Sequence, residues 1–183
     1  NTPLFSHNGN QASLAESVEN PTVFEGTGYR GWVTPDNRLM WHPSRKTIYD
    51  PCPVGYRVPP KVVWRGFLQE NHASQYGITE KYNVSGGWDN GWNFITDGAN
   101  TAYYPVTHYI NSDGYSDWRW RNTENNYMWS SEYENERYAY SFNFYYVNDS
   151  NSNINLQNTS YSTDAYAVRC MKDEGYVDTS LPT

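Results

Sequence analysis

Cysteine is scarce in this chain, with two residues in 183, and they lie far apart. A separation of about 118 positions between Cys52 and Cys170 excludes the closely spaced cysteine pairs of zinc sites and dithiol redox centres. No histidine lies near enough in sequence to complete a metal ligand set. We therefore expect a structural disulfide, which stabilises a loop of this size by up to about 4.7 kcal/mol. The alternative is a pair of buried free thiols that pack as small apolar groups.

Long apolar runs are absent as well. No stretch approaches the ~20 apolar residues that a membrane-spanning helix needs, so the sequence predicts no transmembrane segment. Asn1 is not an initiator methionine, and no signal-peptide pattern follows it. We expect the export signal, and any lipid anchor, to have been on residues that are no longer present.

Basic residues are few and scattered. The chain has 13 Lys and Arg against 20 Asp and Glu, with a net charge of −7 and a pI near 5.0. Binding to phosphate backbones needs clustered Lys and Arg, so nucleic acid is excluded as a partner. Binding to anionic membrane surfaces is disfavoured for the same reason.

Strongly hydrophobic residues are also sparse, because Leu, Ile, Val and Phe together make up roughly 16% of the chain. Such a low value with a net charge is typical of disordered proteins. Here, however, 18 Tyr and 8 Trp supply the missing apolar area, since each buried aromatic side chain contributes about 150–250 Å². The composition predicts one stable domain with an aromatic-rich core.

Two short helices are predicted by capping and hydrophobic spacing. A capping-box pattern at residues 13–16 predicts a helix of about two turns that ends at Pro21. Pro60 suits the first position of a second helix, which we expect to run to about Glu70. The apolar stripe of this second helix, which we expect to pack against a sheet, comprises Val63, Trp64, Phe67 and Leu68.

The remaining regular segments have the composition of strands. Residues 166–171 are rich in β-branched and aromatic side chains, and the prolines of residues 51–60 favour an edge strand or an extended approach to a sheet. A disulfide would then link the first strand of the domain to its last. Residues 138–145 alternate aromatic and small or polar side chains, which predicts an aromatic ladder on one face of a sheet. Residues 154–156 form a short predicted return strand between polar turns at 148–153 and 158–164.

Residues 83–126 lack regular periodicity and contain half of the tryptophans, so we expect long loops that present the functional surface. A sugar offers an apolar C–H face and a rim of hydroxyls, which flat aromatics beside carboxylates and amides can bind. Two loop clusters have this composition. The first comprises Trp88, Asp89, Asn90 and Trp92, and the second comprises Asp117, Trp118 and Trp120. The alternative is that these tryptophans fold inward as packing.

Three motifs, met in this order, resemble a known family. They are Asp-Pro-Cys-Pro-Val-Gly-Tyr-Arg-Val-Pro at residues 50–59, Tyr-Met-Trp-Ser-Ser-Glu at 127–132 and Ala-Val-Arg-Cys-Met-Lys-Asp at 167–173, with a helix-like Trp64 after the first. Together they resemble the major paralogous domain first described in Fibrobacter succinogenes. The chain departs from this family at Pro60, where the family usually has a Thr-type helix cap.

The resemblance covers residues 40–175 and implies a C-type-lectin-like α+β fold. Such a fold has small antiparallel sheets, one or two short helices and long irregular loops. Residues 1–39 are then an N-terminal linker with a short helix, and residues 176–183 are a tail.

The same resemblance implies an exported domain at a bacterial cell surface, outer membrane or pilus. Its expected function is cell adhesion or ligand binding, as at a fimbrial tip, with a surface glycan or a host or bacterial surface protein as partner. The alternative is a structural subunit whose aromatic surface docks other pilins. Both assignments rest on analogy at the level of the fold.

No cofactor is expected, with calcium as the alternative. Calcium needs six to eight oxygen ligands, some of which could come from Asp89, Asp97, Asp113 and Asp117. Residues 88–90 read Trp-Asp-Asn, which reverses the Trp-Asn-Asp motif of true C-type lectins, and no Glu-Pro-Asn-like motif lies upstream.

No catalytic residue is assigned. The histidines at positions 7, 42, 72 and 108 are dispersed, and no nucleophile elbow or zinc-protease motif accompanies them. Glu132, Glu134 and Glu136 alternate in a pattern typical of a solvated edge or turn. Paired carboxylates for glycoside hydrolysis stay open, because their separation is spatial. The lectin-like fold also includes formylglycine-generating enzymes, which rely on active-site cysteines, whereas both cysteines here are assigned to the scaffold.

Overall fold

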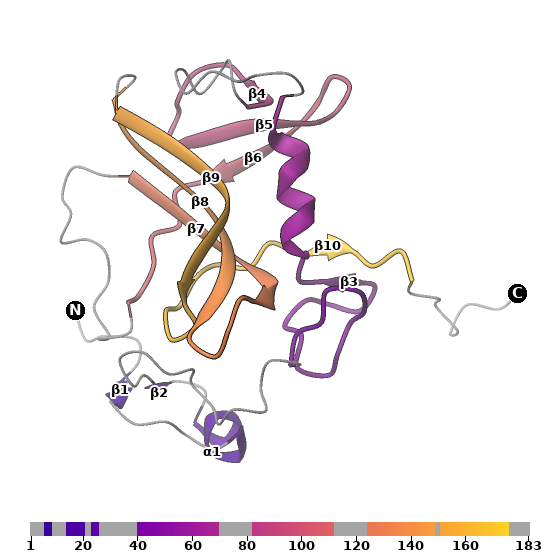
Figure 1. Ribbon diagram of the computed structural model, residues 1–183, viewed down its shortest axis with the longest axis vertical. Coiled ribbons are helices and arrows are strands. Elements are labelled where there is room, and N and C mark those ends of the chain that lie inside the picture. The colour runs from indigo at the N-terminus through magenta and orange to yellow at the C-terminus, as the bar shows by residue number, and fades with distance from the viewer. Residues whose placement is uncertain are drawn as a thin grey trace, which may run out of the picture.

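The computed structural model describes residues 6–8, 14–20, 23–25, 40–69, 82–111, 124–148 and 151–175 (Figure 1). Small antiparallel sheets dominate these residues, together with short helices, which confirms the coarse prediction of a β-rich α+β fold. The second tryptophan cluster, Asp113 and the expected tail at 176–183 lie outside the described residues.

The N-terminal part contains the predicted short helix, α1, over Leu14–Glu19. The backbone N–H of Asn20 donates to the Glu16 carbonyl at 2.9 Å, and the helix stops there, just before Pro21. Two strands that the sequence did not predict, β1 (Ser6–Asn8) and β2 (Val23–Glu25), pair in parallel. Three residues are too few to establish a period-two pattern.

The ends of the main domain pair with each other, as the cysteine motifs predicted. Strand β3 (Tyr56–Arg57) pairs antiparallel with β10 (Met171–Lys172), and the Cys52–Cys170 disulfide lies beside this pair with its Cα atoms 5.7 Å apart. The strand expected over residues 166–171 is shorter in the structure. In its first half only Ala167 makes an isolated bridge, to Met128, and Ala165 just before it makes another, to Ile110.

The second predicted helix is a 3₁₀ helix, η2, over Lys61–Phe67, and is shorter than expected. With three residues per turn, residues three apart lie one above the other. Trp64 and Phe67 are therefore buried together, whereas Val63 and Leu68 from the predicted apolar stripe are exposed. The chain is extended again at Leu68, whose N–H closes the last turn on the Arg65 carbonyl.

Part of the region expected to be irregular forms a sheet. Strands β4 (Val84–Ser85), β5 (Gly91–Asp97) and β6 (Asn100–Pro105) pair antiparallel in the order β4-β5-β6. Trp92 and Phe94 are buried and alternate with more exposed residues, so β5 does have period two. Its short length and polar Asn and Thr positions conceal that period in the sequence.

The second three-stranded sheet has the order β7-β8-β9, formed by β7 (Glu124–Tyr133), β8 (Tyr138–Asn148) and β9 (Asn151–Tyr161). Strand β8 carries the predicted aromatic ladder. The return strand is longer than the predicted 154–156, because its flanking Asn, Ser and Thr residues have low β-propensity but pair with β8 along most of their length.

Strand β8, η2 and the β5-β6 hairpin lie around one region of the domain (Figure 1), and the side chains of the core come mainly from them. Trp64 stacks on Phe142 with ring centroids 5.0 Å apart, and Phe67 lies 4.4 Å from Phe94. The indole N–H of Trp64 donates to the Ser130 hydroxyl at 2.9 Å, which satisfies its buried polar atom. The predicted aromatic-rich core is confirmed. Its buried members are Trp64, Phe67, Tyr82, Trp92, Phe94, Tyr104, Met128, Phe142, Phe144 and Ile154.

A second aromatic cluster contains Tyr127 and Trp129 of β7 together with Tyr109 and Tyr166. Tyr166 stacks on Trp129 at 4.2 Å and lies 4.7 Å from Tyr127. Its hydroxyl donates to the Asp164 carboxylate at 2.9 Å, and burial raises the pKa of Tyr166 far above its ordinary value. Aromatic packing therefore continues beyond the main core.

Within the described ranges, no helix is long and apolar enough to cross a membrane.

Candidate ligand-binding site

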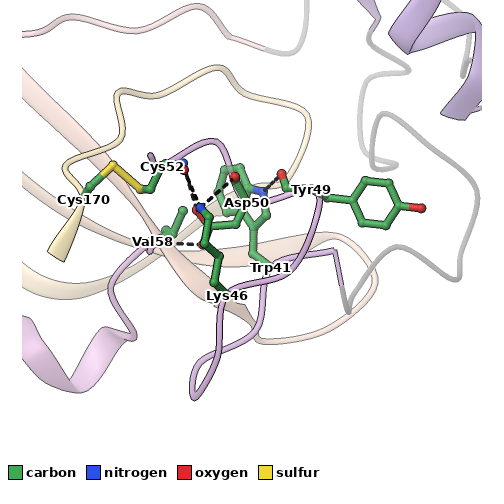
Figure 2. Close-up of a disulfide and its surroundings, with 7 residues drawn as sticks. All are labelled: Trp41, Lys46, Tyr49, Asp50, Cys52, Val58 and Cys170. Atoms are coloured by element: carbon green, nitrogen blue, oxygen red, sulfur yellow. Dashed lines mark hydrogen bonds and ion pairs between the residues drawn. A yellow bond between two sulfur atoms is a disulfide. The ribbon is translucent and has the colours of Figure 1, made fainter. Parts of the chain in front are cut away.

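The first cysteine motif is a scaffold built around the carboxylate of Asp50 (Figure 2). Its Oδ1 atom accepts from the N–H of Cys52 at 2.9 Å and from the Lys46 ammonium at 3.1 Å, and its Oδ2 atom accepts from the N–H of Val58 at 2.9 Å. Lys46 also donates to the Cys52 carbonyl. Because these partners compensate the buried carboxylate, Asp50 fixes the loop that carries the disulfide.

Two further charged residues of the cysteine motifs, Arg57 and Asp173, are also structural. Arg57 donates to the Pro43 carbonyl at 2.6 Å and forms an ion pair with Asp173 at 3.4 Å. The N–H of Asp173 donates to the Gly55 carbonyl at 2.9 Å. The motifs that carry the family resemblance thus hold β3 to β10.

The two tryptophans of the first predicted cluster face inward. Trp92 is only 4% exposed and presents no ring face to solvent. Trp88 is half-buried, stacks on Tyr146 with centroids 4.5 Å apart, and donates its indole N–H to the Glu124 carboxylate at 2.6 Å. These contacts favour the alternative, that the two rings serve as packing: Tyr146 of β8 covers a face of Trp88, Glu124 of β7 accepts from its indole N–H, and Trp92 is buried.

The polar members of that cluster, Asp89 and Asn90, are exposed in the turn that precedes β5. The hydroxyl of Tyr103 donates its single proton to a bifurcated pair of hydrogen bonds, to the carbonyl of Asp89 at 2.7 Å and to the carbonyl of Asn90 at 3.0 Å. The N–H of Val106 also donates to the Asn90 carbonyl, at 2.9 Å. These bonds hold the ring of Tyr103 over the turn.

Gly91 permits this close approach. Its φ is +157°, and a Cβ atom there would lie 2.3 Å from the Tyr104 carbonyl oxygen and 2.9 Å from the Tyr103 ring. Asn90 also adopts a positive φ, of 50°, which asparagine tolerates better than most residues. Only glycine fits at position 91 without displacing β6.

The ring of Tyr103 is 42% exposed, so it remains accessible although its hydroxyl is bonded. We call Asp89, Asn90 and Tyr103 together the Tyr103 surface. Arg169, which lies just before β10, supports it by contacts with β6, since its guanidinium donates to the Tyr103 carbonyl at 2.7 Å and lies 4.1 Å from the ring centroid of Tyr104. Burial raises the pKa of Tyr104, an effect that Arg169 partly offsets, so its phenol stays neutral at pH 7.

The sequence alone does not single out Tyr103, because it is one of 18 tyrosines and lies in no turn motif. The signal that identifies it is alternation along β6, which buries Tyr104 and leaves its neighbour facing outward. That alternation is informative only once residues 100–105 are known to be a strand.

The described residues contain no group of three or more His, Cys, Asp or Glu side chains that could hold a metal ion. Asp89 and Asp97 are exposed and belong to no such group, and Asp113 and Asp117 lie outside the described ranges. Glu134 and Glu136 are exposed between β7 and β8, as the solvated-turn prediction requires, whereas Glu132 accepts from the N–H of Lys61 at 2.7 Å.

Comparison of the chain with protein-family models, with curated proteins and with solved structures finds no match.

Proposed function

We propose that this chain is an exported surface module that binds carbohydrate through the Tyr103 surface. The observation that supports it is the exposed ring of Tyr103, which two hydrogen bonds hold beside the exposed side chains of Asp89 and Asn90. An aromatic ring fixed before binding loses little conformational freedom when a ligand arrives.

The residue types match the chemistry of a sugar. The apolar C–H face of the sugar stacks on the phenol ring, and its hydroxyls donate to the Asp89 carboxylate and pair with the Asn90 amide. The amide nitrogen of Asn90 lies 3.4 Å from a carboxylate oxygen of Asp89, so the two polar groups are neighbours. Recognition of this kind needs no covalent step and no metal.

Export is supported by the Cys52–Cys170 disulfide, because such bonds persist in oxidising compartments. Placement at a bacterial surface or pilus, and the C-type-lectin-like fold, follow from the resemblance of the cysteine motifs to the Fibrobacter family. Adhesion to a glycan-bearing surface is the function that accounts for the disulfide, the resemblance and the Tyr103 surface together.

A glycan array of the purified, disulfide-bonded protein tests the proposal. We expect Tyr103→Ala to abolish binding, because the stacking platform is lost. Tyr103→Phe keeps the ring but loses its two hydrogen bonds, and should weaken binding about 2- to 10-fold.

Tyr145→Ala is the matched control, since Tyr145 is a similarly exposed tyrosine, at 37%, on a different strand. It should bind like the parent protein. A glycan signal that survives in Tyr103→Ala would refute the site, and the absence of any signal from the parent would refute carbohydrate as the ligand.

A further inference from the structure

The two outer edges of the β7-β8-β9 sheet differ. The edge of β7 is covered by backbone hydrogen bonds: the N–H of Trp129 donates to the Ala167 carbonyl, and the N–H of Ser131 donates to the Pro59 carbonyl, each at 3.0 Å. In the part of the chain that the structure describes, residues 151–160 make no backbone–backbone hydrogen bond to any segment other than β8. Among the described residues, the outer edge of β9 is therefore not paired with another strand, and we call it the open edge of β9.

The sequence of β9 contains none of the usual protection. Soluble proteins guard exposed edges with charged side chains, prolines or short strands. Asn151–Tyr161 is eleven residues long and has no charged residue and no proline. Its irregularities are two shifts in pairing with β8, between Ser141 and Asn143 and between Tyr146 and Asn148. Between these shifts the strand is regular, and an edge without charge or proline is a template for another strand.

A groove runs along this edge. It is open, has a volume of about 420 Å³, and is lined by five consecutive residues of β9, at 153–157, together with Arg65, Leu68 and Tyr82. Alternate side chains of a strand point to opposite faces, so five consecutive lining residues place the backbone edge itself in the groove. The Tyr82 hydroxyl donates to the Ile154 carbonyl at 2.5 Å, so Tyr82 already occupies this one acceptor within the groove.

The groove also has a charge preference. Arg65 is the one charged residue in its lining, and within the described ranges its side chain makes no ion pair or hydrogen bond. Leu68, which is 38% exposed, adds an apolar wall, and the amides of Asn153 and Gln157 add polar ones. A guanidinium that has no ion pair among the described residues attracts a carboxylate, even though the protein as a whole has a net charge of −7.

We propose that β9 takes up an extended peptide strand of a partner protein, which pairs with its backbone and places an Asp or Glu side chain on Arg65. Main-chain hydrogen bonds provide affinity, and the alternate side chains provide specificity. A peptide fits better than a sugar because the groove follows a strand edge rather than an exposed ring. This contact is separate from the Tyr103 surface and does not depend on it.

Selection from a displayed library of random 12-residue peptides on the disulfide-bonded protein tests the proposal. We expect enrichment of proline-free segments that alternate apolar and polar residues and contain an Asp or Glu. Arg65→Glu should weaken a synthetic copy of an enriched peptide by about 10- to 100-fold, because a charge-assisted pair becomes a repulsive one. Selection on Arg65→Glu should favour Lys or Arg instead.

Arg137→Glu is the matched control, because it makes the same charge change at an exposed arginine outside the groove. It should leave the selected sequences and their affinity unchanged. Hydrogen exchange then locates the contact: the bound peptide should slow exchange within residues 151–161.

The proposal would be overturned if no peptide were enriched, or if the enriched peptides bound the Arg65→Glu variant as tightly as the parent. Protection from hydrogen exchange confined to another strand would also overturn it. Glycan binding that is lost in Arg65→Glu but kept in Tyr103→Ala would assign the groove to a sugar and likewise refute it. Thermal unfolding of each variant verifies that loss of binding is not loss of the fold.

Discussion

Asp50 is a fully buried carboxylate whose partners are two backbone N–H groups and the Lys46 ammonium. Burial of a charge is costly, and it is tolerated here because every partner donates. Asp50 therefore stabilises the loop around Cys52 through hydrogen bonds on its buried side.

Asp50→Asn should lower the free energy of unfolding by about 2–4 kcal/mol, because the amide cannot neutralise Lys46 and turns a donor toward backbone donors. Urea unfolding of the oxidised protein at pH 7 measures it. Asp89→Asn is the control, since that carboxylate is exposed, and should change stability by less than about 0.5 kcal/mol. An equal effect of both changes would show that the Asp50 network adds nothing.

Single residues also show which properties, such as the orientation of a buried ring, the sequence alone does not predict. Composition identified Trp88 and Trp92 as notable, but whether a ring faces a ligand depends on what lies opposite it. For Trp88 this is Tyr146, far along the chain. Asp89 and Asn90 were placed correctly in an exposed turn, because their polarity alone favours solvent.

At the scale of elements, the turn before β5 determines the geometry of the Tyr103 surface. It brings the carbonyls of Asp89 and Asn90 within hydrogen-bonding distance of the Tyr103 hydroxyl. The next residue is Gly91, where a side chain would collide with β6. Gly87 lies in the same turn with open space around it. The two glycines therefore have different roles.

Gly91→Ala should destabilise the protein by about 2–4 kcal/mol, because its methyl group meets backbone atoms of Tyr104 and Pro105 and the backbone conformation is strained. Thermal denaturation measures the loss, and the glycan array should show weaker binding. Gly87→Ala should leave both unchanged. A Gly91→Ala protein as stable as the parent would mean that the turn relaxes without cost.

Elements were predictable where their residues alternate strongly. The aromatic ladder of β8 has an unmistakable period of two, whereas β5 and β6 mix aromatics with Asn and Thr. Helix η2 was placed almost correctly, but its type was not. The choice of three residues per turn follows from the burial of Trp64 and Phe67 against β8 and β5, which is a tertiary effect.

At the scale of the whole molecule, one disulfide closes a loop with a sequence separation of 118 residues. The order of the cysteine motifs predicted that the first and last strands of the domain meet, and β3 and β10 do. The arrangement of the two three-stranded sheets around η2 was not predictable, because it depends on which aromatic faces meet.

The double change Cys52→Ser and Cys170→Ser should lower the free energy of unfolding by about 2–4 kcal/mol, chiefly by giving the unfolded chain more freedom. Urea unfolding of the oxidised parent and the variant measures it, and the glycan array should still detect binding below the new midpoint. Two thiols that react in the unreduced parent would contradict the disulfide itself.

The same disulfide sets how the domain carries mechanical load. A pull applied before Cys52 and after Cys170 passes through the covalent bond and the short β3-β10 pair. The residues between the cysteines, including the Tyr103 surface and the open edge of β9, lie outside the path of the force. A module anchored by its ends and stretched by flow can therefore keep both surfaces folded while its tethers extend.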